Sequence, residues 1–145
     1  MDEVDRYRVI TWWASGQSGL ARSSCAANAI HFSSPPALGG MEGRWTPEEL
    51  LLCSIASCYM ATFWGLAESA NFEYTDLQVD AEGALRADSG YGFAEIFMHA
   101  SLTIRRRDET ERACDLLYQA RALCPICLAL SIEQKFEPSV NVGGP

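Results

Sequence analysis

The chain has 145 residues, of which 48% are hydrophobic and 21% charged, so it can bury a hydrophobic core and is expected to form a single domain over 1–145. Its 19 acidic and 11 basic residues give a net charge of −8, which disfavours binding to nucleic acid and to anionic membranes. The acidic start, MDEVDRYRV, does not resemble a secretory signal peptide, so a cytoplasmic location is expected.

The first third of the chain is predicted to contain strands and a loop. Residues 4–14 and, more weakly, 26–33 are rich in β-branched and aromatic residues, which indicates strands. GQSG at 16–19 is typical of a turn between them. The segment PPALGGMEGRW at 35–45 holds two prolines and three glycines, which predicts a loop.

A long helix is predicted to follow this loop. Thr46 is a good N-cap, Pro47 suits the first helical position, and Glu49 completes a capping box. The 18 uncharged residues from 50 to 67 are long enough to raise the question of a membrane span. That interpretation is rejected because hydroxyl side chains and two cysteines interrupt the run and no Lys or Arg flanks its end. The helix is instead expected to be surrounded by protein.

The remaining segments complete a mixed pattern. Residues 75–86 and 93–104 alternate in polarity, and DSGYG between them favours a hairpin. There follow a helix from 108 to about 124, a short helical turn over 125–132 and a closing strand over 134–142. Strands, long helix, strands, helix and strand together predict an α+β fold.

Six cysteines make thiol chemistry the main question. Cys53 and Cys58 lie five residues apart on one helix, about 7.5 Å along its axis, so they cannot form a disulfide. Cys53 is therefore interpreted as a small buried residue, as are Cys25 and Cys114. Cys124 precedes a proline at a helix start, where backbone amides are expected to lower its pKa. Cys127 follows one turn later. Two interpretations are equally open: Cys124 caps the helix and Cys127 belongs to the core, or the two cysteines have a redox role.

Other site chemistries fit the sequence less well. Zinc needs about four ligands, and one CxxC with two isolated histidines, His31 and His99, is a poor set. The CxxC lies after a helix near the C-terminus, which is the wrong context for a thioredoxin-like motif. A cysteine hydrolase would need a histidine base in a recognisable motif. Neither a metal nor a bound cofactor is therefore expected.

Three segments, LGG at 38–40, TPEELLLCSIASCYMATF at 46–63 and CPIC at 124–127, together resemble the OsmC/Ohr family of osmotically induced and organic hydroperoxide resistance proteins. The resemblance implies an OsmC-like α+β fold, with antiparallel sheets wrapped around long central helices in an intertwined homodimer. It also implies a thiol peroxidase that a small lipoyl-type dithiol regenerates.

The same resemblance assigns roles to individual residues. Cys58 would be the peroxidatic cysteine, Cys124 the resolving cysteine in a Cys58–Cys124 disulfide, and Glu48 the carboxylate of the site. Glu48 and Cys58 lie ten residues apart on one helix, about 15 Å, so a second subunit must supply one of them if both serve one site. The ordinary alternative for Glu48 is a carboxylate favoured by the helix dipole. Members pair the cysteine with an arginine, for which Arg44 and Arg22 are the candidates, each equally well explained as a surface charge.

The substrate expected from this resemblance is an organic hydroperoxide, with hydrogen peroxide as a further candidate. Tyr59, Trp45 and Trp64 lie near the proposed site in sequence and are predicted to line it, because apolar lining favours organic substituents. The alternative is that all three are core residues. Cys127 is a candidate second resolving thiol. The alternative hypothesis is a non-catalytic OsmC-like dimer that binds a small apolar ligand in an interhelical cavity.

Overall fold

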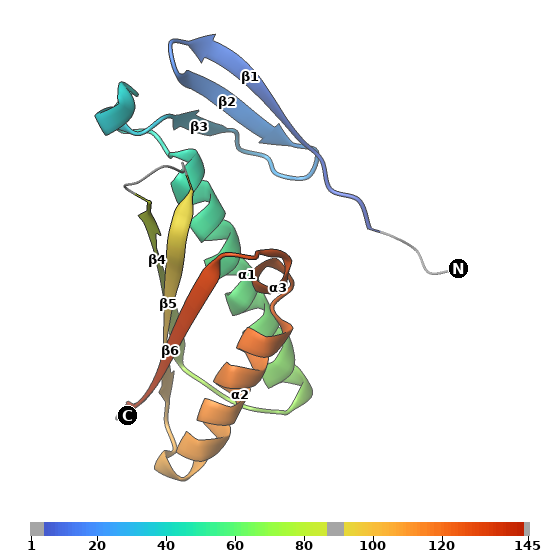
Figure 1. Ribbon diagram of the computed structural model, residues 1–145. Helices are drawn as coiled ribbons and strands as arrows, with labels where there is room; N and C mark the ends of the chain where they lie inside the picture. The colour runs from blue at the N-terminus through green and yellow to red at the C-terminus, as the bar shows by residue number, and fades with distance from the viewer. Residues whose placement is uncertain (1–4, 87–91, 144–145) are drawn as a thin grey trace. The chain divides into compact units, whose positions relative to one another are not determined.

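The structure, a computed structural model, describes residues 5–86 and 92–143 (Figure 1). The chain divides into two compact units, Met1–Leu50 and Leu51–Pro145. Together they contain two three-stranded sheets and the helices between and after them, so the predicted α+β class is confirmed.

The first unit is built on an antiparallel sheet. Strands β1 (Val9–Ser15), β2 (Ser18–Ser23) and β3 (Ile30–Ser33) pair in chain order. Gly16 has a positive φ of 53° in the turn between β1 and β2, a conformation that glycine adopts at little cost. The sequence did not predict β2, because SGLARS lacks β-branched and aromatic residues. The strands predicted over 4–14 and 26–33 begin only at Val9 and Ile30, and residues 1–4 lie outside the described part.

The long helix α1 (Pro47–Ser69) begins at the predicted capping box. The amide of Glu49 donates to Oγ1 of Thr46 (3.1 Å), and the amide of Thr46 donates to Oε1 of Glu49 (3.0 Å). These reciprocal bonds satisfy two amides that a helix start otherwise leaves without partners. The sequence pattern therefore located the helix start correctly.

One face of α1 is buried and the opposite face is exposed. Buried residues recur every four positions: Ile55, Tyr59, Phe63 and Ala67. The prediction that protein surrounds this helix stays a prediction for the dimer, because the single chain covers only one face. The exposed side chains include Cys53, Ser57, Met60, Ala61 and Trp64. By length and composition alone, α1 could cross a membrane, but its buried stripe also forms part of the core of the second unit.

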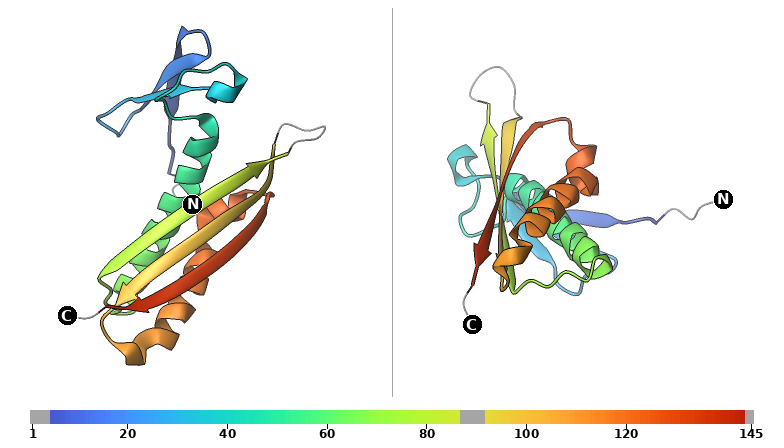
Figure 2. Two further views of the ribbon diagram at one scale, coloured as in Figure 1. Left: turned by 90° about the vertical axis from the view of Figure 1, so that its left-hand side faces the viewer. Right: turned by 90° about the horizontal axis from the view of Figure 1, so that it is seen from below.

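The second unit places helices against one face of a sheet (Figure 2). Strands β4 (Asp76–Leu85) and β5 (Phe93–Ile104) are antiparallel, whereas β6 (Glu133–Val142) runs parallel to β5. A parallel pair needs a long connection, which α2 (Thr110–Leu123) and α3 (Pro125–Ala129) provide. All five elements lie close to their predicted positions, and the predicted DSGYG hairpin turn falls mainly outside the described residues.

The core of the second unit lies between the sheet and its helices. Alternate β5 residues are buried, and they pack with the buried faces of α1 and α2. This alternation is the period-two pattern expected of a strand that is covered on one face. The β5 residues in this layer are Ile96, Met98, Ala100, Leu102 and Ile104.

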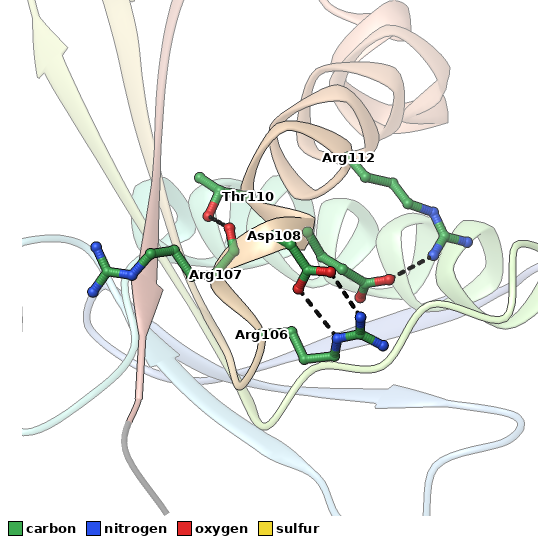
Figure 3. Close-up of polar contacts among 6 residues, drawn as sticks. Arg106, Arg107, Asp108, Thr110 and Arg112 are labelled. Carbon is green, nitrogen blue, oxygen red and sulfur yellow. Dashed lines mark hydrogen bonds and ion pairs between the residues drawn. The ribbon is translucent and has the colours of Figure 1, made fainter.

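Ion pairs brace the start of α2, where a short 3-10 turn, Arg107–Glu109, precedes the helix (Figure 3). Arg106 binds both carboxylate oxygens of Asp108 (3.1 and 2.7 Å), and Arg112 pairs with Glu109 at 3.1 Å. The Arg106–Asp108 pair is largely exposed, and such pairs contribute little stability.

Candidate active site

Two cysteines that are distant in sequence meet in the second unit. Cys58 is half-buried on α1 and packs against the core cluster that contains Cys124, at the start of α3. Cys124 is fully buried. The two thiols influence each other's pKa, and the backbone of Ile126 favours the Cys58 thiolate. The packing of α3 against α1 therefore creates the thiol pair that the resemblance implies.

The protonation of both thiols is governed mainly by burial. Removal from water raises the pKa of Cys58, the Ile126 amide opposes that effect, and the neighbouring Cys124 adds to it. Burial likewise raises the pKa of Cys124. The prediction of a lowered Cys124 pKa is therefore wrong: the Cys127 amide does favour the Cys124 thiolate, but burial outweighs it.

Tyr59 and Cys127 complete the buried surroundings of Cys124. Tyr59 is fully buried, its ring packs on Phe136 with centroids 5.3 Å apart, and its hydroxyl donates to the Leu117 carbonyl at 2.9 Å. The prediction that Tyr59 lines the substrate site is wrong for this structure, because none of its surface reaches solvent. Cys127, 3% exposed, lies in the same core cluster.

Arg121 is a cation close to Tyr59, and it was not among the predicted site residues. Its charge opposes the burial that raises the pKa of Tyr59. Its guanidinium donates to Oε1 of Gln134 (2.9 Å), and Nε2 of Gln134 donates to the Cys127 carbonyl (3.0 Å). A signal was available, since Arg121 lies three residues before Cys124, about one turn away near the end of a predicted helix.

Four other predicted site residues belong to the first unit. Arg22 and Arg44 are exposed, and Nε of Arg44 lies 3.4 Å from the sulfur of Met41. Trp45 is half exposed beside β3. Among the described residues, Oε2 of Glu48 is buried without a hydrogen-bond partner. The roles of these residues at Cys58 stay predictions, because Cys58 belongs to the second unit.

Trp64 lines a cavity of about 660 Å³ in the second unit that contains none of the cysteines. Its walls carry charged as well as aromatic side chains, so it is not the purely apolar cavity of the alternative hypothesis. Arg106, labelled in Figure 3, and Glu109 contribute to this charge. The lining residues are Trp64, Glu68, Phe72, Glu73, Tyr74, Thr75, Arg105, Arg106 and Glu109.

The remaining cysteines correct a further prediction. Cys25 and Cys53 are exposed, although both were expected to be buried, and Cys114 is only half-buried. Cys25 lies in the turn region between β2 and β3, and Cys53 lies on the free face of α1. The helix of residues 47–69 was predicted to be covered on every side. Its sequence pattern therefore could not distinguish buried cysteine positions from exposed ones.

Comparison with known proteins identifies relatives of the whole chain. The sequence pattern of the OsmC-like protein family matches residues 40–139. The chain is also 29% identical over 138 residues to YmaD of Bacillus subtilis (strain 168), an uncharacterized protein, in an alignment that covers 91% of this chain and 92% of YmaD.

Solved structures share the fold at low identity. An OsmC-like protein from Mycoplasma pneumoniae has a TM-score of 0.82 at 17% identity and covers 97% of this chain and 99% of its own. The organic hydroperoxide resistance protein OsmC from Legionella pneumophila has a TM-score of 0.76 at 22% identity. The match covers 97% of this chain and 100% of that chain. OhrB of Bacillus subtilis, an organic hydroperoxide resistance protein, has a TM-score of 0.70 at 20% identity. The match covers 93% of this chain and 98% of that chain.

These likenesses agree with the α+β fold described above. The family pattern covers well over half of the residues. The chain therefore belongs to the OsmC-like protein family.

Proposed function

We propose that the protein is a thiol peroxidase that reduces organic hydroperoxides through Cys58. The observation that carries this proposal is the half-buried Cys58 thiol packed against the buried cluster that contains the Cys124 thiol. A thiol that a peroxide can reach and a second thiol nearby are the two groups that a dithiol peroxidase requires. Proteins of similar structure that are named for organic hydroperoxide resistance support the choice of substrate class.

The chemistry begins when the Cys58 thiolate attacks the distal peroxide oxygen. The O–O bond breaks, the alcohol leaves, and Cys58 becomes a sulfenic acid. Cys124 then condenses with the sulfenic acid, which releases water and forms a Cys58–Cys124 disulfide. A small lipoyl-type dithiol reopens this bond through a mixed disulfide at Cys58, the more exposed of the two sulfurs.

A cation is needed because burial raises the pKa of Cys58 within one chain. In the proposed homodimer, an arginine from the loop or sheet of the first unit, Arg44 or Arg22, stabilises the Cys58 thiolate. The Oε2 atom of Glu48, buried and without a hydrogen-bond partner among the described residues, would orient that guanidinium through a charge-assisted hydrogen bond. The exposed face of α1 gives the partner subunit a surface on which to pack.

Substrate preference is proposed to come from aromatic side chains near the shared site. Trp45 and Trp64 are half exposed in the single chain and would gain apolar contacts with a bulky peroxide substituent. Organic hydroperoxides would then react faster than hydrogen peroxide, which offers no apolar surface.

The direct experiment measures intact mass after addition of one equivalent of cumene hydroperoxide. We expect the loss of two hydrogens, no loss in Cys58→Ser, and the normal loss in Cys53→Ser. Cys53 is the matched control because it is exposed on the same helix, five residues earlier. Dihydrolipoamide should restore the original mass. Wild-type protein whose mass stays unchanged would contradict the proposal and favour ligand binding without catalysis.

A further inference from the structure

The segment CPIC places two cysteines across one helical turn. Cys124 is the N-cap of α3, Pro125 is its first residue and Cys127 its third. An N-cap side chain lies near the amide of the third helical residue, and here the backbone of Cys127 favours the Cys124 thiolate while the neighbouring Cys127 thiol raises the pKa of Cys124. Both thiols belong to the same buried cluster. The local backbone thus brings the two sulfurs to the same end of α3.

Cys124 is the central member of a row of three thiols. It approaches Cys58 of α1 on one side and Cys127 of its own helix on another. Cys124 and Cys127 are 0% and 3% exposed, whereas Cys58 is half-buried. Solvent and small molecules therefore reach the row mainly from Cys58. Cys124 and Cys127 can contact each other more readily than either can contact a thiol from outside the protein.

The backbone of α3 is held in place from the sheet and from its own turn. Nε2 of Gln134 donates to the carbonyl oxygens of Cys127 (3.0 Å) and Leu130 (3.4 Å). The amide of Leu128 donates to the Cys124 carbonyl at 3.0 Å. These bonds keep Cys127 beside Cys124 before any oxidation occurs.

We propose that Cys127 is a relay thiol that takes over the disulfide from Cys58. This inference rests on the peroxidase function proposed above. After the Cys58–Cys124 disulfide forms, the Cys127 thiolate attacks the Cys124 sulfur. The Cys124–Cys127 bond forms, the Cys58–Cys124 bond breaks, and Cys58 leaves as a thiolate with the electron pair. The proton of Cys127 passes to solvent or to Cys58, and no net oxidation or reduction takes place.

The relay increases the number of hydroperoxide molecules that one subunit can reduce before it needs a reductant. The oxidised pair is stored as a buried Cys124–Cys127 disulfide, while Cys58 is again free to react with a second peroxide. Electrons from a dithiol return by the reverse exchange, because Cys58 is the most accessible sulfur of the row. One subunit therefore reacts with about two equivalents of hydroperoxide before it needs a reductant.

The experiment follows disulfide connectivity and peroxide consumption without a reductant. Wild-type protein receives one equivalent of cumene hydroperoxide, is quenched with acid at increasing times and is mapped by mass spectrometry. We expect Cys58–Cys124 to appear first and Cys124–Cys127 to replace it. A second equivalent added with dimedone should then label Cys58 in molecules that carry the Cys124–Cys127 bond.

Variants of Cys127 test its role directly, and a variant of Cys114 provides the control. Cys127→Ser and Cys127→Ala should stop at Cys58–Cys124 and consume about one equivalent instead of about two. Cys114→Ser, which removes a half-buried cysteine of α2, should behave as wild type. The time course in wild-type protein decides the question even if the Cys127 variants do not fold.

Three outcomes would overturn the relay. A wild-type Cys58–Cys124 bond that persists without rearrangement, or a direct Cys58–Cys127 bond, would show that Cys127 does not relay while the peroxidase function stands. A wild-type protein with all thiols still reduced would remove the peroxidase function and the relay together. The pattern of bonds therefore separates the two failures.

Discussion

At the scale of single residues, the ionisation of Cys58 results from opposing local effects. Burial and the neighbouring Cys124 raise its pKa, while the Ile126 amide lowers it. The sequence could suggest Cys58 and Cys124 through their motifs, but it could not predict this balance, because Ile126 is 68 positions away and reaches Cys58 only in the folded chain. The reversed prediction for Cys124 has the same cause: helix-start amides are visible in sequence, whereas burial is not.

The proposed arginine makes a prediction about pH. A cation close to the sulfur should lower the pKa of Cys58, so the thiolate should form at lower pH. We expect the rate of Cys58 alkylation by iodoacetamide to reach half its maximum below pH of about 8.5. Loss of the activating arginine, in Arg44→Gln or Arg22→Gln, should move that midpoint above this value.

Peptide mapping of the alkylated protein measures Cys58 separately from the other cysteines. The exposed Cys53 provides an internal control, because its profile should be the same in the wild type and in both variants. An unchanged Cys58 midpoint in both variants would show that neither arginine activates it.

At the scale of elements, those specified by neighbouring residues could be predicted from the sequence, whereas those that depend on long-range contacts could not. The start of α1 was predictable because the capping box involves neighbouring residues, and β4 and β5 were predictable because of their alternation. The strand β2 was missed because pairing with β1 and β3, not its own composition, makes SGLARS a strand. The parallel pairing of β6 with β5 likewise depends on long-range contacts.

Tyr59 joins α1 to α2 and gives a stability prediction. In Tyr59→Phe the ring packing on Phe136 remains, but the hydroxyl bond to the Leu117 carbonyl is lost. We expect the free energy of unfolding to fall by about 0.5–1.5 kcal/mol, measured by urea denaturation. Tyr118→Phe is the matched control, since Tyr118 is 57% exposed on α2, and should change stability by less than about 0.5 kcal/mol. Equal effects of the two variants would refute a special role for the Tyr59 hydroxyl.

At the scale of the whole molecule, one chain leaves much apolar surface uncovered. Sixteen large hydrophobic residues are exposed among the described residues, including Met60 and Trp64 on α1. Exposed apolar surface of this kind commonly marks an interface. If Glu48 and Cys58 serve one site, as the family resemblance implies, the partner is a second copy of the chain, because the two residues cannot meet within one helix.

The dimer prediction concerns the exposed face of α1. Wild-type protein should have about twice the 16.0 kDa chain mass in light scattering after size-exclusion chromatography. Ala61→Glu places a charge on that face and should shift the protein toward the monomer, because burying an unpaired charge is costly. Gln119→Glu, an equal charge change at an exposed position of α2, should leave the dimer intact. A monomeric wild-type protein would contradict a site shared between subunits.

The identity of the nucleophile is tested most directly in the Cys124→Ser, Cys127→Ser double variant, which lacks both inner thiols. One equivalent of cumene hydroperoxide is added with dimedone, which traps sulfenic acids, and the labelled peptide is identified by mass spectrometry. The account predicts label on Cys58 and none on the exposed Cys25 or Cys53. Absence of label on Cys58, or equal label on the exposed cysteines, would contradict it.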